Sequence, residues 1–308
     1  MNHNHQVVKA TRARGVATMP QVVGVHGIGQ QQLGAKQLLK DWAPALGDGI
    51  DAALGHDPTR PEVNFKLGFY GKLFLPEIAP RNNSDKDTKK SVAAVADDLD
   101  EAEVEWFDDV ADEVGAPPIG ALEDLAAGTP ADPEWVAKAI RLPGPIARLA
   151  AWLDNQFGAA GPLLFFSDLR QVQRYQRDEG IADAARARVL DAAGDGCTVL
   201  VGPSLGSVVA YEVACLTPPT GLRLLVTLGS PLGLATVRRR LRHPGPPDGI
   251  AWVNVVDPKD PVCCAGGVKL HWPTAHDRLV HNGDQPHSAT RYLGKGQTGE
   301  AVARALGW

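Results

Sequence analysis

Short β-branched runs alternate with longer helical patterns along this chain, and that alternation limits its fold more than any other feature. Each run ends at glycine or at turn-forming residues, which predicts buried strands. A strand followed by a helix and then by another strand favours right-handed crossovers and parallel pairing. We therefore expect an α/β fold, a mostly parallel sheet flanked by helices. The predicted strands span residues 21–27, 62–71, 198–202, 222–230 and 250–257, and the predicted helices span 31–46, 169–193 and 205–216.

One long segment, residues 80–161, interrupts this rhythm. It contains no good strand pattern, only helical pattern broken by stretches rich in Pro and Gly. Apolar residues recur at helical spacing from Val92 to Val110, with acidic residues on the other faces, which predicts an amphipathic acidic helix. The acidic face is either a solvated surface or a site for cations or a partner. We expect residues 20–308 to form one domain, with 80–161 inserted as a helical cap or lid and 1–19 as a flexible tail.

Composition argues against several classes of protein. A formal net charge of -5 over 308 residues disfavours a basic face that binds nucleic acid. No apolar run approaches the roughly 20 residues that a membrane helix needs, and the N-terminal residues lack the apolar core of a secretory signal. We therefore expect a cytoplasmic protein with reduced cysteines and no transmembrane segment. The four cysteines show no zinc-ligand spacing, so no metal is expected.

A serine between two glycines follows the third predicted strand, in the sequence Gly202-Pro-Ser204-Leu-Gly206. A nucleophilic serine needs a sharp strand-to-helix turn that projects its hydroxyl beyond the sheet, and flanking glycines let the strand and the helix pass each other. The N-terminus of the following helix favours negative charge that develops there. The pattern predicts that Ser204 is a nucleophile. The alternative is a small residue in a tight connection.

The first predicted strand ends in a second glycine-containing sequence, His26-Gly27-Ile28-Gly29. An acyl-transfer site needs backbone N–H groups aimed at the developing oxyanion, and a glycine-lined loop supplies such groups. The alternative is a dinucleotide-binding loop, but its third glycine would fall at position 32, where the chain has Gln32. The loop therefore favours acyl transfer over nucleotide binding.

A catalytic triad also needs an acid and a histidine, and both occur later in the chain. Asp257 and Asp260 follow the last predicted strand, where a carboxylate can orient an imidazole. Of the histidines that come after them, His287 lies in a turn-rich loop just before a helical pattern. From such a loop an imidazole can reach the serine hydroxyl as a general base. The residues alone leave both Asp257 and Asp260 open as the acid.

These segments together resemble the α/β-hydrolase superfamily, in its lipase and esterase branch. "VHGIG" is similar to the oxyanion loop of lipases, "GPSLGSVVAYE" to their nucleophile elbow and "WVNVVDPKDPV" to their acid-bearing segment. The resemblance covers nearly the whole chain apart from the tail and the insertion. It implies Ser204 as the nucleophile, His287 as the general base and Asp260 as the acid that orients it. It also implies an oxyanion hole made by the N–H groups of Ile28 and Leu205.

The leading hypothesis is a serine hydrolase that cleaves a carboxylic ester, lipid-like or small, or a thioester, without a metal or an organic cofactor. His26, Gly27 and Pro203 are expected to line the substrate pocket. The family commonly carries His at the position of Pro203, which is the one departure of this sequence. Two alternatives stay open: a catalytically impaired scaffold that binds a small ligand or a protein partner, and an acyltransferase on the same triad. No nucleic-acid partner is expected, and the sequence does not reveal the oligomeric state.

Overall fold

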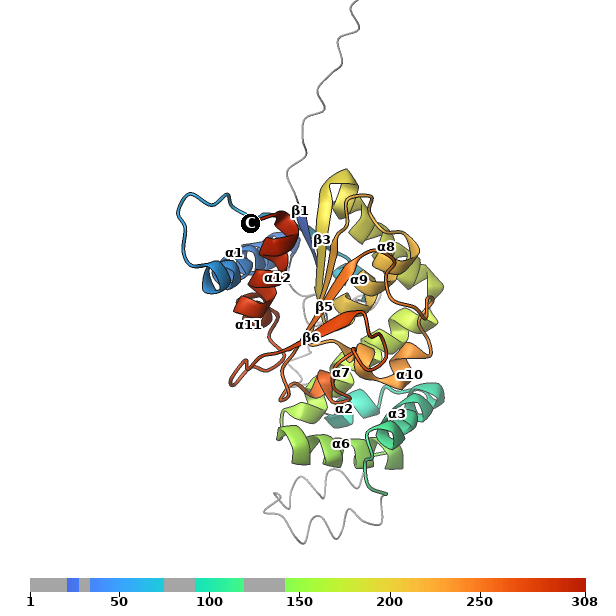
Figure 1. The fold of residues 1–308 in the computed structure, drawn as a ribbon. Helices are drawn as coiled ribbons and strands as arrows, with labels where there is room; N and C mark the ends of the chain where they lie inside the picture. Colours follow the sequence, from blue (N-terminus) through green and yellow to red (C-terminus); the bar gives the residue numbers. More distant parts are fainter. Residues whose placement is uncertain (1–20, 28–33, 75–91, 119–141) are drawn as a thin grey trace, which may run out of the picture.

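The computed structural model describes residues 21–27, 34–74, 92–118 and 142–308, which form an α/β structure (Figure 1). Six strands make one sheet in the order β2-β1-β3-β4-β5-β6, and every neighbouring pair is parallel. The prediction of a mostly parallel sheet with flanking helices is therefore confirmed at the level of the α/β class. The tail predicted at 1–19 lies outside the described residues. The strands are β1 (Gln21–Val25), β2 (Asn64–Gly68), β3 (Cys197–Pro203), β4 (Leu224–Leu228), β5 (Ala251–Val256) and β6 (Ala275–Leu279).

The inner strands and the edge strands differ in burial. Every residue of β1, β3 and β4 is buried, as expected for parallel strands covered by helices on both faces. At one edge of the sheet, β6 exposes most of its Ala-His-Asp-Arg-Leu sequence. The sequence pattern predicted five strands. It did not predict β6, because this polar edge strand has no run of apolar residues.

Helices cover both faces of the sheet (Figure 1). On one face, α1, α11 and α12 pack over a core that contains Trp42, Leu46 and Val302. On the other face, α8 and α9 pack over a core that contains Val189 and Val208. Because all six strands are parallel, the loops that follow their carboxyl ends lie at the same end of the sheet. These helices are α1 (Ala35–Leu54), α8 (Glu179–Ala193), α9 (Leu205–Leu216), α11 (Ala289–Leu293) and α12 (Gly296–Leu306).

The chain between β2 and β3 adds a second group of helices, which lies apart from α1 and α12 (Figure 1). The single amphipathic helix predicted from Val92 to Val110 is broken in two. It breaks because Asp100 starts a new helix: its carboxylate accepts the N–H of Glu103 at 2.7 Å, and Glu103 accepts the N–H of Asp100 at 2.9 Å. This reciprocal capping fixes the start of a helix. The described helices here are α2 (Val92–Ala96), α3 (Glu101–Glu113), α6 (Gly144–Phe157) and α7 (Gly161–Arg177).

The acidic face of this insertion is paired with basic side chains of the chain itself. Arg148 of α6 lies 3.0 Å from Asp108 and 2.8 Å from Asp112 of α3. Glu113 accepts N–H groups at the start of α10 (Ala235–Arg238). Arg239, which directly follows α10, pairs with Asp109 of α3. In its described part, the acidic face therefore serves to dock the insertion on its own fold.

Candidate functional site

Ser204 lies between β3 and α9 in a strained backbone conformation. Its φ of 49° and ψ of -128° make it the one non-glycine residue with positive φ among the described residues. Such a conformation costs about 1–3 kcal/mol and persists only where the surrounding structure enforces it. The glycines on either side allow it, because a β-carbon on Gly202 would meet the carbonyl of Gly206 and one on Gly206 would meet the carbonyl of Val25. The predicted strand–turn–helix context of Ser204 is therefore present.

The close approach at Gly206 makes a stability prediction. We expect Gly206→Ala to destabilise the fold by about 3 kcal/mol or more, because the new β-carbon would overlap backbone atoms that have no room to move. Gly47→Ala is the matched control, since Gly47 lies inside α1 and an added β-carbon there meets nothing within 4 Å. That change is expected to stabilise the helix by about 0.5–1 kcal/mol. Urea unfolding measures both, and an unchanged midpoint for Gly206→Ala would contradict the tight elbow.

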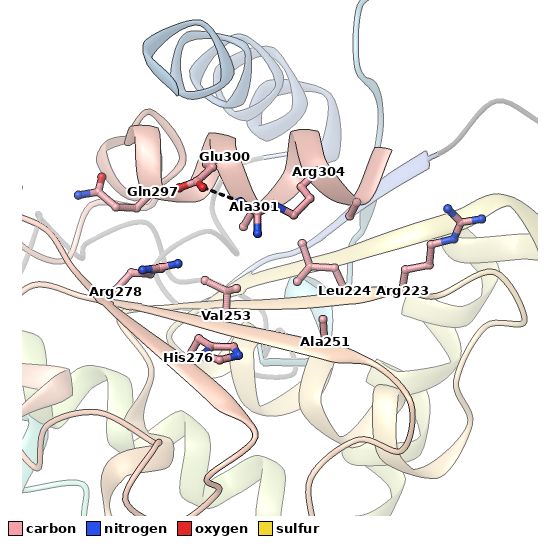
Figure 2. Close-up of a pocket in the computed structure, with 11 residues that line it drawn as sticks. Arg223, Leu224, Ala251, Val253, His276, Arg278, Gln297, Glu300, Ala301 and Arg304 are labelled. Atoms are coloured by element: carbon pink, nitrogen blue, oxygen red, sulfur yellow. Dashed lines mark hydrogen bonds and ion pairs between the residues drawn. The ribbon is translucent and has the colours of Figure 1, made fainter. Parts of the chain in front are cut away.

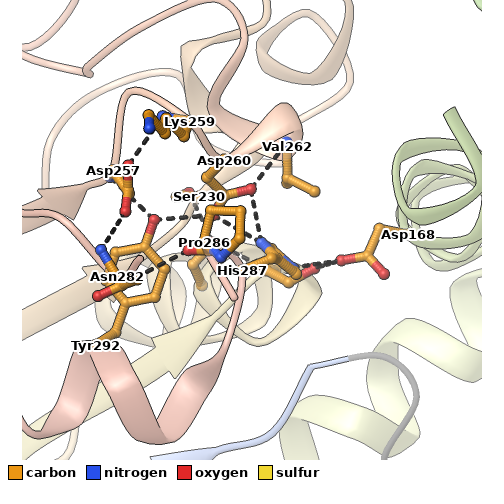
Figure 3. A network of polar contacts seen from close by, with 12 residues as sticks. Asp168, Ser230, Asp257, Lys259, Asp260, Val262, Asn282, Pro286, His287 and Tyr292 are labelled. Atoms are coloured by element: carbon orange, nitrogen blue, oxygen red, sulfur yellow. Dashed lines mark hydrogen bonds and ion pairs between the residues drawn. The ribbon is translucent and has the colours of Figure 1, made fainter. Parts of the chain in front are cut away.

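His287 and Asp260 are hydrogen-bonded to each other (Figure 3). His287 follows β6, and its Nδ1 lies 2.8 and 2.7 Å from the two carboxylate oxygens of Asp260, which follows β5. Asp260 also accepts the N–H of Val262 at 3.0 Å and the hydroxyl of Tyr292 at 2.8 Å. These bonds fix the carboxylate, so Nδ1 is the protonated donor toward Asp260 and Nε2 faces the other way.

The second candidate acid, Asp257, is used differently. Its carboxylate accepts the N–H of Asn282 at 2.5 Å and the N–H of Lys259 at 2.9 Å (Figure 3). Both bonds go to backbone, so Asp257 ties the turn after β5 to the loop after β6. Of the two aspartates that the sequence left open, Asp260 is the one hydrogen-bonded to His287.

A third carboxylate, which the sequence analysis did not predict, joins the serine to the histidine. Ser204 Oγ donates to Asp168 Oδ2 at 2.5 Å, and the same oxygen lies 2.7 Å from His287 Nε2. Asp168 comes from α7 and is only 7% exposed, and Ser204 is 3% exposed. Figure 3 shows Asp168 reaching His287 from the side opposite Asp260. Ser204 and His287 are therefore brought together through Asp168.

The sequence did contain a signal for Asp168. The predicted helix over 169–193 begins one residue after it, whereas α7 begins at Gly161 and a separate helix, α8, follows at Glu179. Within α7, Asp168 shares a face with the buried Phe165, Leu169 and Val172. A carboxylate on an apolar helix face is unusual unless it is paired. The position of Asp168 on this face therefore indicates that its side chain has a polar partner.

The two carboxylates decide the protonation of His287. Burial lowers the pKa of His287, but the charges and hydrogen bonds of Asp260 and Asp168 together outweigh burial and raise that pKa well above its ordinary value. The charged imidazolium is therefore favoured at neutral pH. In that form each ring nitrogen donates a proton to one carboxylate.

His26 has a backbone role in this structure. Its Nε2 accepts the N–H of Tyr70 at 3.0 Å, and its Nδ1 lies 2.8 Å from the carbonyl of Gly27. Burial lowers the pKa of His26 to about 4, so the ring is neutral at pH 7 and Nδ1 donates to that carbonyl. Both ring nitrogens are used by the chain itself, so His26 shapes the loop after β1 and has no nitrogen left for a substrate.

Of the two predicted oxyanion donors, Ile28 follows the loop residue Gly27 and Leu205 follows Ser204 in sequence. A β-carbon on Gly27 would lie 2.8 Å from the carbonyl oxygen of Pro203 and 3.1 Å from Cβ of Ser204, so the end of the β1 loop touches the elbow. Leu205 is the first residue of α9, where N–H groups have no partner within the helix. Ile28 lies outside the described residues.

A cavity of about 270 Å³ opens onto Ser204 and His287. Gly27 and Pro203, two of the three residues predicted to contact substrate, line it, and His26 does not. The remaining wall comes from α1 and from the start of α11.

A second cavity, of about 390 Å³, lies between α12 and the strands β4 to β6 (Figure 2). Its walls carry the basic side chains of Arg223 and Arg278, and Arg304 there is paired with Glu300 at 2.9 Å. It shares no lining residue with the cavity at Ser204. None of the predicted site residues therefore bears on this second cavity.

Comparison with known proteins gives no relative: no protein-family model, no curated protein and no solved structure matches the chain. Within the described ranges, no group of three or more His, Cys, Asp and Glu side chains is placed to hold a metal ion. No helix in those ranges is long and apolar enough to cross a membrane. The chemistry of the site therefore has to be argued from its own geometry.

Proposed function

We propose that this chain is a serine hydrolase of the α/β-hydrolase type that cleaves a carboxylic ester. The observation that carries the proposal is the strained Ser204, at the carboxyl end of β3, beside the bonded pair His287 and Asp260. The strained turn is the conformation expected of a nucleophile elbow. The order serine, aspartate, histidine along the chain and the parallel strand order also support this type.

The proposed mechanism gives these residues the roles of a catalytic triad. Ser204 Oγ attacks the ester carbonyl carbon while Nε2 of His287 takes the hydroxyl proton, and Asp260 stabilises the imidazolium that forms. The N–H of Leu205 and that of Ile28 stabilise the oxyanion. As the tetrahedral intermediate collapses, His287 returns the proton to the departing alcohol and the acyl group stays on Ser204. Water then attacks the acyl carbon as His287 takes one of its protons, and on collapse of the second intermediate His287 gives that proton to Ser204 Oγ, which frees the carboxylic acid.

The cavity favours a small substrate. Its volume of about 270 Å³ lies just below the roughly 300–1,000 Å³ of pockets that enclose drug-sized ligands. The described part of the lining therefore fits a small acyl ester better than a long-chain lipid. Initial rates on p-nitrophenyl esters and thioesters of increasing acyl length test this directly. We expect the highest kcat/KM for the shorter chains, and no turnover of any ester would contradict the proposal.

The raised pKa of His287 makes a prediction about pH. His287 accepts a proton only when neutral, so the rate is low below its pKa and rises as the pH passes through it. Because the pKa of His287 is raised, we expect the acid limb of the kcat/KM profile above the ordinary histidine value of about 6.5. Hydrolysis of a soluble p-nitrophenyl ester from pH 5 to pH 9 measures the limb. A limb at or below that value would contradict the assignment.

One observation favours the second candidate, a catalytically impaired scaffold. Asp168 takes both the hydroxyl hydrogen bond of Ser204 and the Nε2 contact of His287, so this arrangement leaves no free base beside the serine. If Asp168 always keeps these two contacts, the chain is a binding protein. If Asp168 can release them, the chain is an enzyme in a resting state. The two candidates therefore differ in what happens when the Asp168 carboxylate is removed.

A further inference from the structure

Asp168 occupies the place where a hydrolase needs a hydrogen bond from its serine to its histidine. One atom, Oδ2, makes both contacts, at 2.5 Å to Ser204 Oγ and at 2.7 Å to His287 Nε2. The carboxylate is only 7% exposed, so water does not compete freely for it. A buried hydrogen bond to a charged group is among the stronger polar contacts in proteins.

These contacts fix the protons of the site. Nδ1 of His287 donates to Asp260, so only Nε2 is available to act as a base. Two lone pairs do not face each other at 2.7 Å, and therefore a proton lies between Nε2 and Asp168, carried by one or the other. In either case the lone pair of Nε2 is occupied. The hydroxyl of Ser204, meanwhile, donates its proton to Asp168.

The helix that carries Asp168 is held by the insertion. Arg170 donates to the carboxylate of Glu103 on α3 at 3.1 Å, and the amide of Gln173 donates to the carbonyl of Ala102 at 3.3 Å. On the inner face of α7, Leu169 is fully buried in the core. Withdrawal of Asp168 thus takes either a rotation of its side chain or a shift of α7 together with the helices bound to it.

We infer that Asp168 is a latch, a carboxylate that holds the site at rest between Ser204 and His287, and that hydrolysis requires it to leave them. This inference rests on the proposed function, because a latch has meaning only where there is a nucleophile to release. Removing the carboxylate is then expected to speed the reaction of Ser204, the opposite of what removing a catalytic acid does.

Asp168→Asn and Asp168→Ala test the latch, the first by removing the charge at constant shape and the second by removing the group. The readout is the second-order rate of fluorophosphonate attachment to Ser204 at pH 7, followed by intact mass. We expect both variants to react about tenfold to a hundredfold faster than the parent, because a hydrogen bond to a charged group shifts an equilibrium by about that factor. Asp154→Asn, the same change on α6, is the control and should leave the rate unchanged.

The outcomes separate the latch from the proposed function. If the parent reacts and neither Asp168 variant is faster, the latch is wrong while the hydrolase stands. If both variants lose the reaction, Asp168 is an active participant and the latch is again wrong. If neither the parent nor any variant is labelled, both proposals fail together. Removal of the Asp168 carboxylate would then leave Ser204 as unreactive as before.

The pH profile of labelling gives a readout that a purely structural role would not move. In the described structure His287 is hydrogen-bonded to Asp260 and Asp168, and the buried Tyr292 and Cys263 lie beside Asp260. Asp168 raises the pKa of His287, so its loss in Asp168→Asn lowers that pKa. The acid limb of the labelling rate should therefore move to lower pH than in the parent. A faster variant with an unmoved limb would contradict the latch.

Discussion

Ester hydrolysis is expected to fall by a factor on the order of 10³ to 10⁶ when Ser204 is replaced by alanine. The expected loss is large because Ser204 supplies the nucleophile that attacks the ester in the proposed mechanism. What remains after its removal is catalysis by substrate binding and by oxyanion donors alone. Rates on the best p-nitrophenyl ester of the panel measure the effect, with the parent protein prepared in parallel.

The same substitution should leave the fold intact. Alanine keeps the β-carbon of Ser204 at a φ of 49°, so the backbone strain is similar in the two proteins. The lost hydroxyl made one buried hydrogen bond, to Asp168, whose loss costs about 1–3 kcal/mol. Circular dichroism and thermal unfolding check this. A folded Ser204→Ala protein that retains the parental rate would mean that another residue carries the reaction.

Replacing Asp260 by asparagine is expected to lower kcat by about 10⁴-fold. The neutral amide cannot stabilise the imidazolium. Its NH₂ group can instead donate to Nδ1 of His287, which favours the tautomer that carries its proton on Nε2 and cannot act as the base. Both carboxylate oxygens of Asp260 contact Nδ1, at 2.8 and 2.7 Å. The measurement is kcat with a soluble ester at saturating concentration and a pH on the plateau of the parental profile.

Asp257→Asn is the matched control for that experiment. It makes the same chemical change three residues away, on a carboxylate that accepts backbone N–H groups from Asn282 and Lys259. It should cost about 1–3 kcal/mol of stability and change kcat by no more than a few-fold. A larger loss of kcat in Asp257→Asn than in Asp260→Asn would reverse the assignment of the acid.

Sequence patterns were sufficient where a residue's role is local. Buried parallel strands such as β3 and β4 show as β-branched and apolar runs, because both of their faces need apolar side chains. The elbow at Ser204 was readable from its flanking glycines, since only glycine avoids the backbone of Gly206 and Val25. The α/β class and the strand–turn–helix context of the serine therefore followed from the chain alone.

Features that depend on distant contacts were not readable in this way. Asp168 lies 36 residues from Ser204 and 119 from His287, so its place on an apolar helix face indicates a partner but does not identify Ser204 and His287 as that partner. Asp257 and Asp260 are equivalent by spacing, and only their partners distinguish them. The edge strand β6 was missed because its exposed side chains carry no apolar signature.

Treatment of the purified chain with a fluorophosphonate, followed by mapping of the modified peptide by mass spectrometry, tests whether Ser204 is an activated nucleophile. An activated serine loses its proton to the base and displaces fluoride from phosphorus, which gives one covalent adduct. We expect a single adduct on Ser204 that is absent from Ser204→Ala. Two results would contradict this assignment: no adduct on either the folded parent or the folded Asp168→Asn protein, or an adduct that persists in Ser204→Ala.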